Sequence, residues 1–148
     1  MINVSTLLNQ KGSTVWTINP EATILDALMQ MSRRNVGALV VEENGEICGI
    51  VSERDFARKT AETRSGNLIS PVKEFMTSKV FTVTPEQTLD ECMVWMTKEH
   101  IRHLPVVKEK QLLGIISIGD VVKNLLDDKS STIDSMEDYI LGRGYVTK

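Results

Sequence analysis

The chain has 148 residues, 41% of them hydrophobic and 25% charged, and its 17 basic and 20 acidic side chains leave a net charge of −3. This balance argues against nucleic acid as a partner, and the two cysteines, each inside an apolar segment, exclude a disulfide scaffold or a cysteine-rich zinc site. No apolar run approaches the ~20 residues of a membrane span and no basic leader opens the chain, so we expect a soluble cytoplasmic protein without membrane or nucleic-acid partners.

The first residues predict a short helix and then a strand. Val4, Leu7 and Leu8 are spaced so that they share one face of a helix, and Gly12 is placed to end it. Residues 14–19 are rich in β-forming side chains, which predicts a strand.

An amphipathic helix and a β-hairpin follow. Thr23 lies three residues before Asp26, a spacing typical of a capping box, and an apolar stripe behind it predicts a helix. Residues 38–41 predict a short buried strand, and the Asn44–Gly45 pair predicts a tight turn into a returning strand at residues 47–52.

The turn from that returning strand into the next predicted helix, residues 53–62, occurs twice in the chain. Four residues of this stretch recur 65 positions further on: Gly49, Ile50, Ser52 and Asp55 return as Gly114, Ile115, Ser117 and Asp120. A repeat of this kind predicts paired sites at equivalent positions of the fold.

The repeat divides the chain into two similar parts. Residues 15–56 align without a gap with residues 80–121. The polar segment at residues 64–67 is the candidate boundary, and Ser70 followed by Pro71 predicts an N-cap with proline at the first helical position. We therefore expect one repeat at residues 1–64, a second at residues 65–126 and a C-terminal helical tail at residues 127–148.

The duplicated turn suits a nucleotide. A helix N-terminus offers free amide hydrogens and partial positive charge to phosphate, a serine hydroxyl can bind a phosphate oxygen, and a carboxylate three residues on can accept from the ribose hydroxyls. The same spacing is also a common helix cap, so spacing alone favours a structural role, and a cap would be duplicated too. Two pairs of segments can form an adenine slot: Thr17-Ile18 with Ala38-Leu39, or Thr82-Val83 with His103-Leu104-Pro105.

Cationic side chains near these turns are further candidates for phosphate binding. Arg54, Arg58 and Lys59 can meet a diphosphate at the first turn, or they can form the solvated face of an exposed helix. Arg102 and His103 can do the equivalent work at the second turn. For His103 the alternative is a strand-start residue bonded to the backbone.

The remaining candidates have structural explanations. Cys48 and Cys92 align with apolar positions of the other repeat, which favours core packing. His100 follows a predicted helix and is expected to end it. Trp16 and Trp95 are expected in the core or at a dimer contact, with stacking on a ligand as the alternative for Trp16.

Together these features resemble the tandem cystathionine-β-synthase (CBS) domain pair, or Bateman module, over nearly the whole chain. The resemblance is carried by four motifs: Val72-Lys73-Glu74-Phe75-Met76-Thr77, the turns at Pro20 and Pro85 with Thr23 and Thr88 after them, Ile101-Arg102-His103-Leu104-Pro105-Val106-Val107, and the two glycine-to-aspartate stretches. It implies an α+β fold in which two βαββα repeats pack by pseudo-twofold symmetry, with short leading helices, a C-terminal helix and two clefts.

The resemblance also implies a function. Small stand-alone bacterial members of the family are expected to bind AMP and NAD, with ADP, ATP and S-adenosylmethionine as further candidates, the aspartates holding ribose and the hydroxyls holding phosphate. We therefore expect a regulatory, ligand-sensing homodimer that signals to an unknown effector protein through its conformation or assembly. A dimerising adaptor without ligand is the alternative.

No residues predict catalysis or a metal site, because the two histidines flank one short segment and no metal-ligand spacing occurs. We therefore expect no enzyme activity. The predicted ligand-binding residues are Thr17, Ile18, Ala38, Leu39, Ser52, Arg54, Asp55, Thr82, Val83, Arg102, His103, Leu104, Pro105, Ser117 and Asp120.

Overall fold

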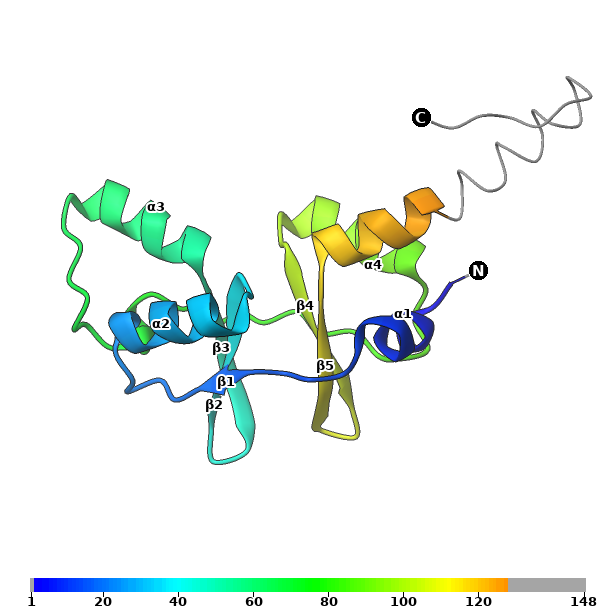
Figure 1. Ribbon diagram of the computed structural model, residues 1–148, viewed down its shortest axis with the longest axis horizontal. Helices are drawn as coiled ribbons and strands as arrows, with labels where there is room; N and C mark the ends of the chain where they lie inside the picture. The colour runs from blue at the N-terminus through cyan, green and yellow to red at the C-terminus, as the bar shows by residue number, and fades with distance from the viewer. Residues whose placement is uncertain (1, 128–148) are drawn as a thin grey trace, which may run out of the picture.

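Two similar halves lie side by side in the structure, a computed structural model that describes residues 2–127 (Figure 1). The first half contains β1 (Thr17–Ile18), α2 (Ile24–Arg34), β2 (Ala38–Glu43), β3 (Glu46–Ser52) and α3 (Glu53–Thr63). The second half contains α4 (Leu89–Glu99), β4 (His103–Lys108), β5 (Gln111–Ser117) and the helical residues 118–127. The predicted α+β repeat fold is confirmed. The predicted helical tail, apart from residue 127, lies outside the described residues.

Each half holds an antiparallel hairpin with the same register. Ala38 of β2 lies opposite Ser52 of β3, and His103 of β4 lies opposite Ser117 of β5. The expected turn at Asn44–Gly45 is present, and both residues have positive φ angles, 53° and 79°, as a tight hairpin turn of this type requires. Each hairpin therefore delivers its serine to the start of the helix that follows.

The first strand is shorter than predicted. Only Thr17 and Ile18 pair with β2, in parallel, and a single parallel bridge between Val83 and Val106 takes the equivalent place in the second half. The rest of the predicted strand at residues 14–19 is therefore not part of the sheet, although its side chains are β-formers.

The segments that lead each half are exchanged between the two cores. Helix α1 (Val4–Lys11) places Val4 and Leu7 in the core of the second half. The short 3-10 helix η1 (Val72–Glu74) places Val72 in the core of the first half. Backbone hydrogen bonds fix both crossings, at 2.9 Å from the Val4 amide to the carbonyl oxygen of Gln87 and at 2.7 Å from the Val72 amide to that of Ala22. Each leading segment therefore links its own half to the core of the other half.

A glycine lies where each leading segment crosses a hairpin. A Cβ atom at Gly49 would lie 2.5 Å from the Met76 sulfur and 3.0 Å from the Thr77 carbonyl oxygen. A Cβ atom at Gly114 would lie 2.7 Å from a methyl group of Leu8. Side-chain contacts this short do not occur in folded proteins, so the duplicated glycine of the repeat allows the crossing segment to touch the strand.

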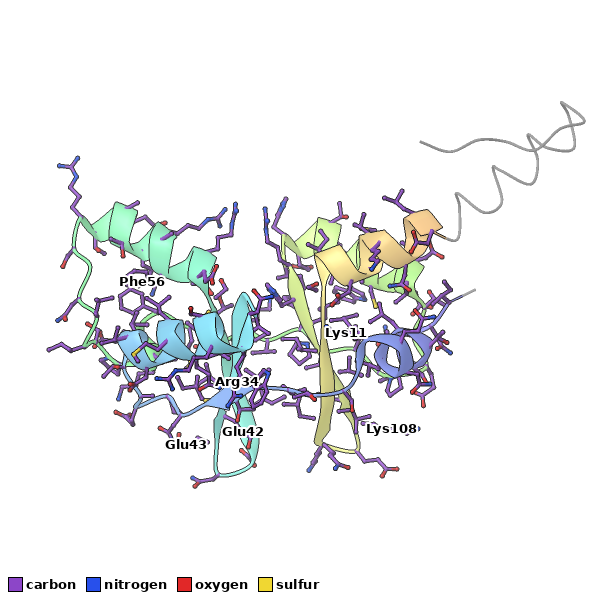
Figure 2. The ribbon with its side chains drawn as sticks, in the orientation of Figure 1. Lys11, Arg34, Glu42, Glu43, Phe56 and Lys108 are labelled. Carbon is purple, nitrogen blue, oxygen red and sulfur yellow. The ribbon has the colours of Figure 1, made fainter. Side chains whose placement is uncertain are left out.

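The start of η1 differs from the sequence prediction. Pro71 is the N-cap, and no side chain caps this helix. The Ser70 carbonyl oxygen accepts from the Ile24 amide at 2.9 Å. Helix α3 is tied to the segment around η1. The Phe56 and Phe75 rings lie 5.7 Å apart, and Lys59 donates to the Glu74 carbonyl oxygen at 2.6 Å; Phe56 is labelled below α3 in Figure 2. These contacts set the direction in which α3 leaves the sheet.

Candidate functional site

Two clefts of about 320 Å³ each lie between the halves. Cleft 1 combines Ser52, Arg54, Asp55 and Arg58 of the first half with Thr77, Lys79, Val80, Phe81, Arg102 and His103 of the second. Cleft 2 combines Ser117, Asp120 and Ile115 of the second half with Thr14, Trp16, Asn35, Val36 and Ala38 of the first, together with Lys11 of α1. Each cleft thus takes its serine–aspartate turn from one half and its opposite wall from the other.

The serine–aspartate turn is a helix cap in both halves. In cleft 1 the Asp55 Oδ2 atom accepts from the Ser52 amide and hydroxyl, both at 3.0 Å, and the Ser52 hydroxyl oxygen accepts from the Asp55 amide at 3.1 Å. In cleft 2 the Asp120 Oδ2 atom accepts from the Ser117 amide at 2.9 Å. The expected cap is therefore real at both turns.

The cap leaves part of each carboxylate free for another role. The hydrogen bonds of Asp55 and Asp120 within residues 2–127 all end on Oδ2, and Oδ1 accepts none from this part of the chain. A carboxylate has acceptor sites on both oxygens. Because both side chains line a cleft, capping and binding of a hydroxyl-bearing ligand are compatible. The two explanations that the sequence sets against each other can both hold.

Cleft 1 is lined by several cationic side chains. Arg54, Arg58, Lys79 and Arg102 all line it, and no ion pair joins any of them to a carboxylate within residues 2–127. The charge of Arg102, and then that of Arg58, lowers the pKa of Arg54. Such repulsion between neighbouring guanidinium groups is relieved when an anion lies between them. This lining suits a ligand with several negative charges.

Cleft 2 has its cation already paired. Lys11 Nζ lies 2.6 Å from Asp120 Oδ2 and 2.9 Å from the carbonyl oxygen of Ile115, and Figure 2 shows Lys11 at the end of α1 beside β5. Burial acts to raise the pKa of Asp120, but the hydrogen bonds from Lys11 and from the Ser117 amide prevail and lower it. Asp120 is thus held as a carboxylate.

An aromatic ring forms the opposite wall of each cleft. Trp16 lines cleft 2, with the Arg34 guanidinium 3.8 Å from its ring centroid, and Phe81 lines cleft 1 at the equivalent position of the repeat. Lys79 Nζ lies 5.4 Å from the Phe81 ring centroid. A flat apolar surface beside polar backbone edges is what an adenine ring requires.

His103 belongs to both clefts. Its side chain and Gly37 line each of them, so the imidazole forms part of the wall that separates the two sites. Burial lowers the pKa of His103, and the charge of Lys11 lowers it further, against the opposite influence of Asp120 and Asp55. We expect the imidazole to be neutral in the folded protein near pH 7.

The lowered pKa of His103 predicts a pH-dependent stability. Below about pH 6.5 the unfolded chain binds a proton at this histidine more readily than the folded chain does, so the free energy of unfolding should fall as pH decreases and stay unaffected at higher pH. The variant His103→Asn should lose less stability than wild type between about pH 7 and about pH 5. Urea unfolding across this range measures the difference, with His100→Asn, at the exposed end of α4, as the matched control. Equal pH profiles for wild type and His103→Asn would contradict this explanation.

The clefts contain some of the predicted binding residues and exclude others. Ala38, Ser52, Arg54, Asp55, Arg102, His103, Ser117 and Asp120 line them. The other predicted residues, which belong to the adenine-slot segments, line neither cleft: Thr17, Ile18, Leu39, Thr82, Val83, Leu104 and Pro105. Leu39, Val83 and Leu104 are buried in the two cores. The adenine-slot role of these segments stays a prediction, with Ala38 and His103 as the members that line a cleft.

Arg102 lies in the other cleft from the one that the sequence suggested. The sequence assigned it to the second turn, whereas it lines cleft 1 beside Arg54, because the wall of each cleft comes from the opposite half. Lys59 lines neither cleft and donates to the backbone of Glu74 instead. His100 ends α4 as expected, with a positive φ of 55°, and it also borders cleft 1.

Sequence reasoning missed Lys11, Lys79 and Phe81 as cleft residues and considered a ligand contact of Trp16 only as the alternative. Trp16 aligns with Phe81, and the alignment of Val4 with Val72 in the leading segments carries Lys11 onto Lys79. In each aligned pair one residue lines cleft 2 and the other lines cleft 1. The alignment pairs these residues, but it does not indicate that they line a cleft.

One of the two cysteines lies deep in a core, as the alignment of the repeats predicts. Cys92 is fully buried in the core of the second half, where burial raises the pKa of its thiol to about 11.

Within residues 2–127 no three His, Cys, Asp or Glu side chains come close enough to hold a metal ion. None of the helices in this part of the chain has the length and apolar character needed to cross a bilayer.

Comparison with known proteins agrees with this architecture. The model of the CBS domain matches residues 12–62 and again residues 72–127. The mitochondrial CBS domain-containing protein CBSX3 of Arabidopsis thaliana is 39% identical over 139 residues, which cover 90% of this chain and 66% of that protein. The CBS domain-containing protein YhcV of Bacillus subtilis is 33% identical over 129 residues, which cover 86% of this chain and 91% of that protein.

A solved structure has the same fold. The crystal structure of a CBS-domain containing protein from Agrobacterium tumefaciens superposes with a TM-score of 0.79 at 37% sequence identity, over 82% of this chain and 98% of that chain. Both repeats are therefore found in the same order and arrangement in a protein of similar size. The chain belongs to the CBS-domain family, and its two repeats form a CBS-domain pair.

Proposed function

We propose that the protein is a regulatory module that binds adenine nucleotides, AMP and NAD-like ligands among them, in clefts 1 and 2. CBS-domain pairs are regulatory modules, and the ligand class is our inference. The observation that carries it is the serine–aspartate turn in each cleft, where the carboxylate caps the helix with one oxygen and keeps the other free. Ribose hydroxyls would donate to the free oxygen, and phosphate would lie against the serine and the helix N-terminus.

The charges divide the ligands between the clefts. Cleft 1, with Arg54, Arg58, Lys79 and Arg102, would take the ligand with more phosphate, such as ADP, ATP or the diphosphate of NAD. Cleft 2, where the cation Lys11 is already paired, would take a ligand with less negative charge, such as AMP. The volume of each cleft lies at the lower end of the range typical of small-molecule sites.

One structure of the same fold supports the adenosine class. The CBS domain pair of protein MJ0100, solved in complex with 5′-methylthioadenosine and S-adenosyl-L-methionine, superposes with a TM-score of 0.74. At 24% identity that likeness extends to the fold alone. The assignment of a ligand to this chain therefore rests on its own turns and charges.

Signalling would proceed from one CBS pair, with repeats at residues 1–64 and 65–126 and a tail at residues 127–148, to an effector protein in the cytoplasm. We propose no catalytic role for any residue. Exposed apolar side chains on the helices support assembly into a homodimer, with Val94 64% and Met29 43% exposed. The same observation favours the second candidate function, an adaptor that dimerises without ligand. One relative of this fold at 30% identity is described as hexameric.

A thermal-shift panel separates the two candidates. AMP, ADP, ATP, NAD, NADH and S-adenosylmethionine are tested one at a time against the purified protein. A ligand at 100 times its Kd should stabilise the fold by about 2.7 kcal/mol, which raises Tm by roughly 5–10 °C for a domain of this size. Stabilisation by none of the six would leave the adaptor function as the better explanation.

A further inference from the structure

Cleft 2 differs from cleft 1 in one contact that bears on ligand choice. The carboxylate that would hold ribose, Asp120, is already bound to the ammonium group of Lys11 at 2.6 Å. We propose that Lys11 is the phosphate-selecting residue of cleft 2: it holds Asp120 Oδ2 while the cleft is empty, and it passes to the ligand phosphate when the second ribose hydroxyl takes its place on that oxygen. This inference rests on the proposed nucleotide binding and adds a specificity residue to it.

The position of Lys11 allows such an exchange. It is the last residue of α1, whose Val4 and Leu7 are fixed in the core of the second half, so the Lys11 backbone has a firm base. Its side chain is 33% exposed, that of Asp120 is 28% exposed, and both line cleft 2. A lysine ammonium is a point charge on a flexible four-carbon stem and can change partner within a site without movement of the backbone.

The exchange makes affinity depend on phosphate. A nucleoside without phosphate must either leave the Lys11–Asp120 pair intact and bind through the free Oδ1 atom alone, or displace Lys11 from Oδ2 and leave an ammonium group without an anion under the ligand. An unpaired charge that loses contact with water is strongly unfavourable. A nucleotide brings its own anion, and a charge-assisted hydrogen bond from Lys11 to phosphate replaces the one given up.

The repeat supplies a matched comparison. Lys79, which aligns with Lys11, lines cleft 1, yet within residues 2–127 it forms no ion pair with Asp55 and lies over the Phe81 ring. The ribose carboxylate of cleft 1 is therefore not occupied by a lysine. Lys79 can add to phosphate binding there, but it does not compete with ribose.

Isothermal titration of adenosine and AMP tests the proposal at cleft 2. The protein carries Asp55→Ala to silence cleft 1, and Lys11→Met is compared with Lys11 in that background. Removal of Lys11 should weaken AMP binding and strengthen adenosine binding, so that the ratio of their affinities falls by about tenfold or more. The variant Lys11→Arg keeps the charge and should keep the preference for AMP.

The control uses the other cleft. In an Asp120→Ala background, Lys79→Met should weaken AMP binding without strengthening adenosine binding. Lys11 is not a selector if Lys11→Met weakens the binding of AMP and adenosine equally, leaves both affinities unchanged or fails to strengthen adenosine binding. Each of these results overturns the inference while nucleotide binding stands. If the protein with both clefts intact binds neither AMP nor adenosine, the proposed function itself fails, and the inference fails with it.

Discussion

Replacement of Asp55 by alanine is expected to abolish nucleotide binding at cleft 1 and to leave cleft 2 occupied, and Asp120→Ala should do the reverse. In the proposed complex each carboxylate accepts from two ribose hydroxyls, and hydrogen bonds to a charged group contribute about 1.5–3 kcal/mol each. Loss of both should weaken binding by about 100-fold or more. Calorimetry with NAD should show the cleft 1 site lost in Asp55→Ala, and calorimetry with AMP should show the cleft 2 site lost in Asp120→Ala.

The control for this experiment lies in α2. Thr23 and Asp26 form the same capping box as Ser52 and Asp55, but they line neither cleft. Asp26→Ala should therefore cost about 1 kcal/mol of stability through the weakened cap and leave both affinities unchanged. Unchanged stoichiometry and affinity in Asp55→Ala and Asp120→Ala would show that the ribose assignment is wrong.

Alanine at Gly49 is expected to lower the stability of the whole fold. The added methyl group would meet the Met76 side chain at 2.5 Å and the Thr77 carbonyl oxygen at 3.0 Å, and the second of these belongs to the backbone. Overpacking of this kind costs typically 1–3 kcal/mol. Urea unfolding should place Gly49→Ala near the upper end of that range and Gly114→Ala, which meets only the Leu8 side chain, below it.

Two variants check that the crossing segment is the cause. In a double-mutant cycle, Met76→Ala should reduce the destabilisation caused by Gly49→Ala, because the contact with the Met76 side chain disappears. Part of the destabilisation should remain, because the contact with the Thr77 backbone is still present. Gly119→Ala, whose nearest atom would be the Ser117 hydroxyl oxygen at 3.6 Å, should leave the protein as stable or slightly more stable, since the residue is helical. Equal destabilisation by all three glycine substitutions would rule out a specific crossing contact.

Much of the fold could be predicted because its signals are local in the sequence. The capping boxes at Thr23 and Ser52 and the hairpin turn at Asn44–Gly45 each involve residues no more than three positions apart, and all three are present. The duplication added a check, because a residue in one repeat predicts the role of its counterpart in the other. For this reason both serine–aspartate turns were found without knowledge of the fold.

The walls of the clefts could not be predicted because they depend on contacts between the halves. Nothing near Arg102 in the sequence indicates that it lies beside Arg54.

The orientation of side chains within a strand is a second difficulty for prediction. Ala38 borders cleft 2 while its neighbour Leu39 is fully buried, and a continuous apolar run does not reveal which face is which. Only an observed register decides between them.

The exchange of the leading segments has a consequence for the history of this chain. Each repeat carries, at its start, the piece that completes the other repeat's core, α1 for the second half and η1 for the first. A fragment that ends near residue 64 would therefore lack part of its own interior and offer α1 to a companion. A one-repeat ancestor would have been complete only as two molecules that swapped these ends, and gene duplication would have turned that dimer into one chain.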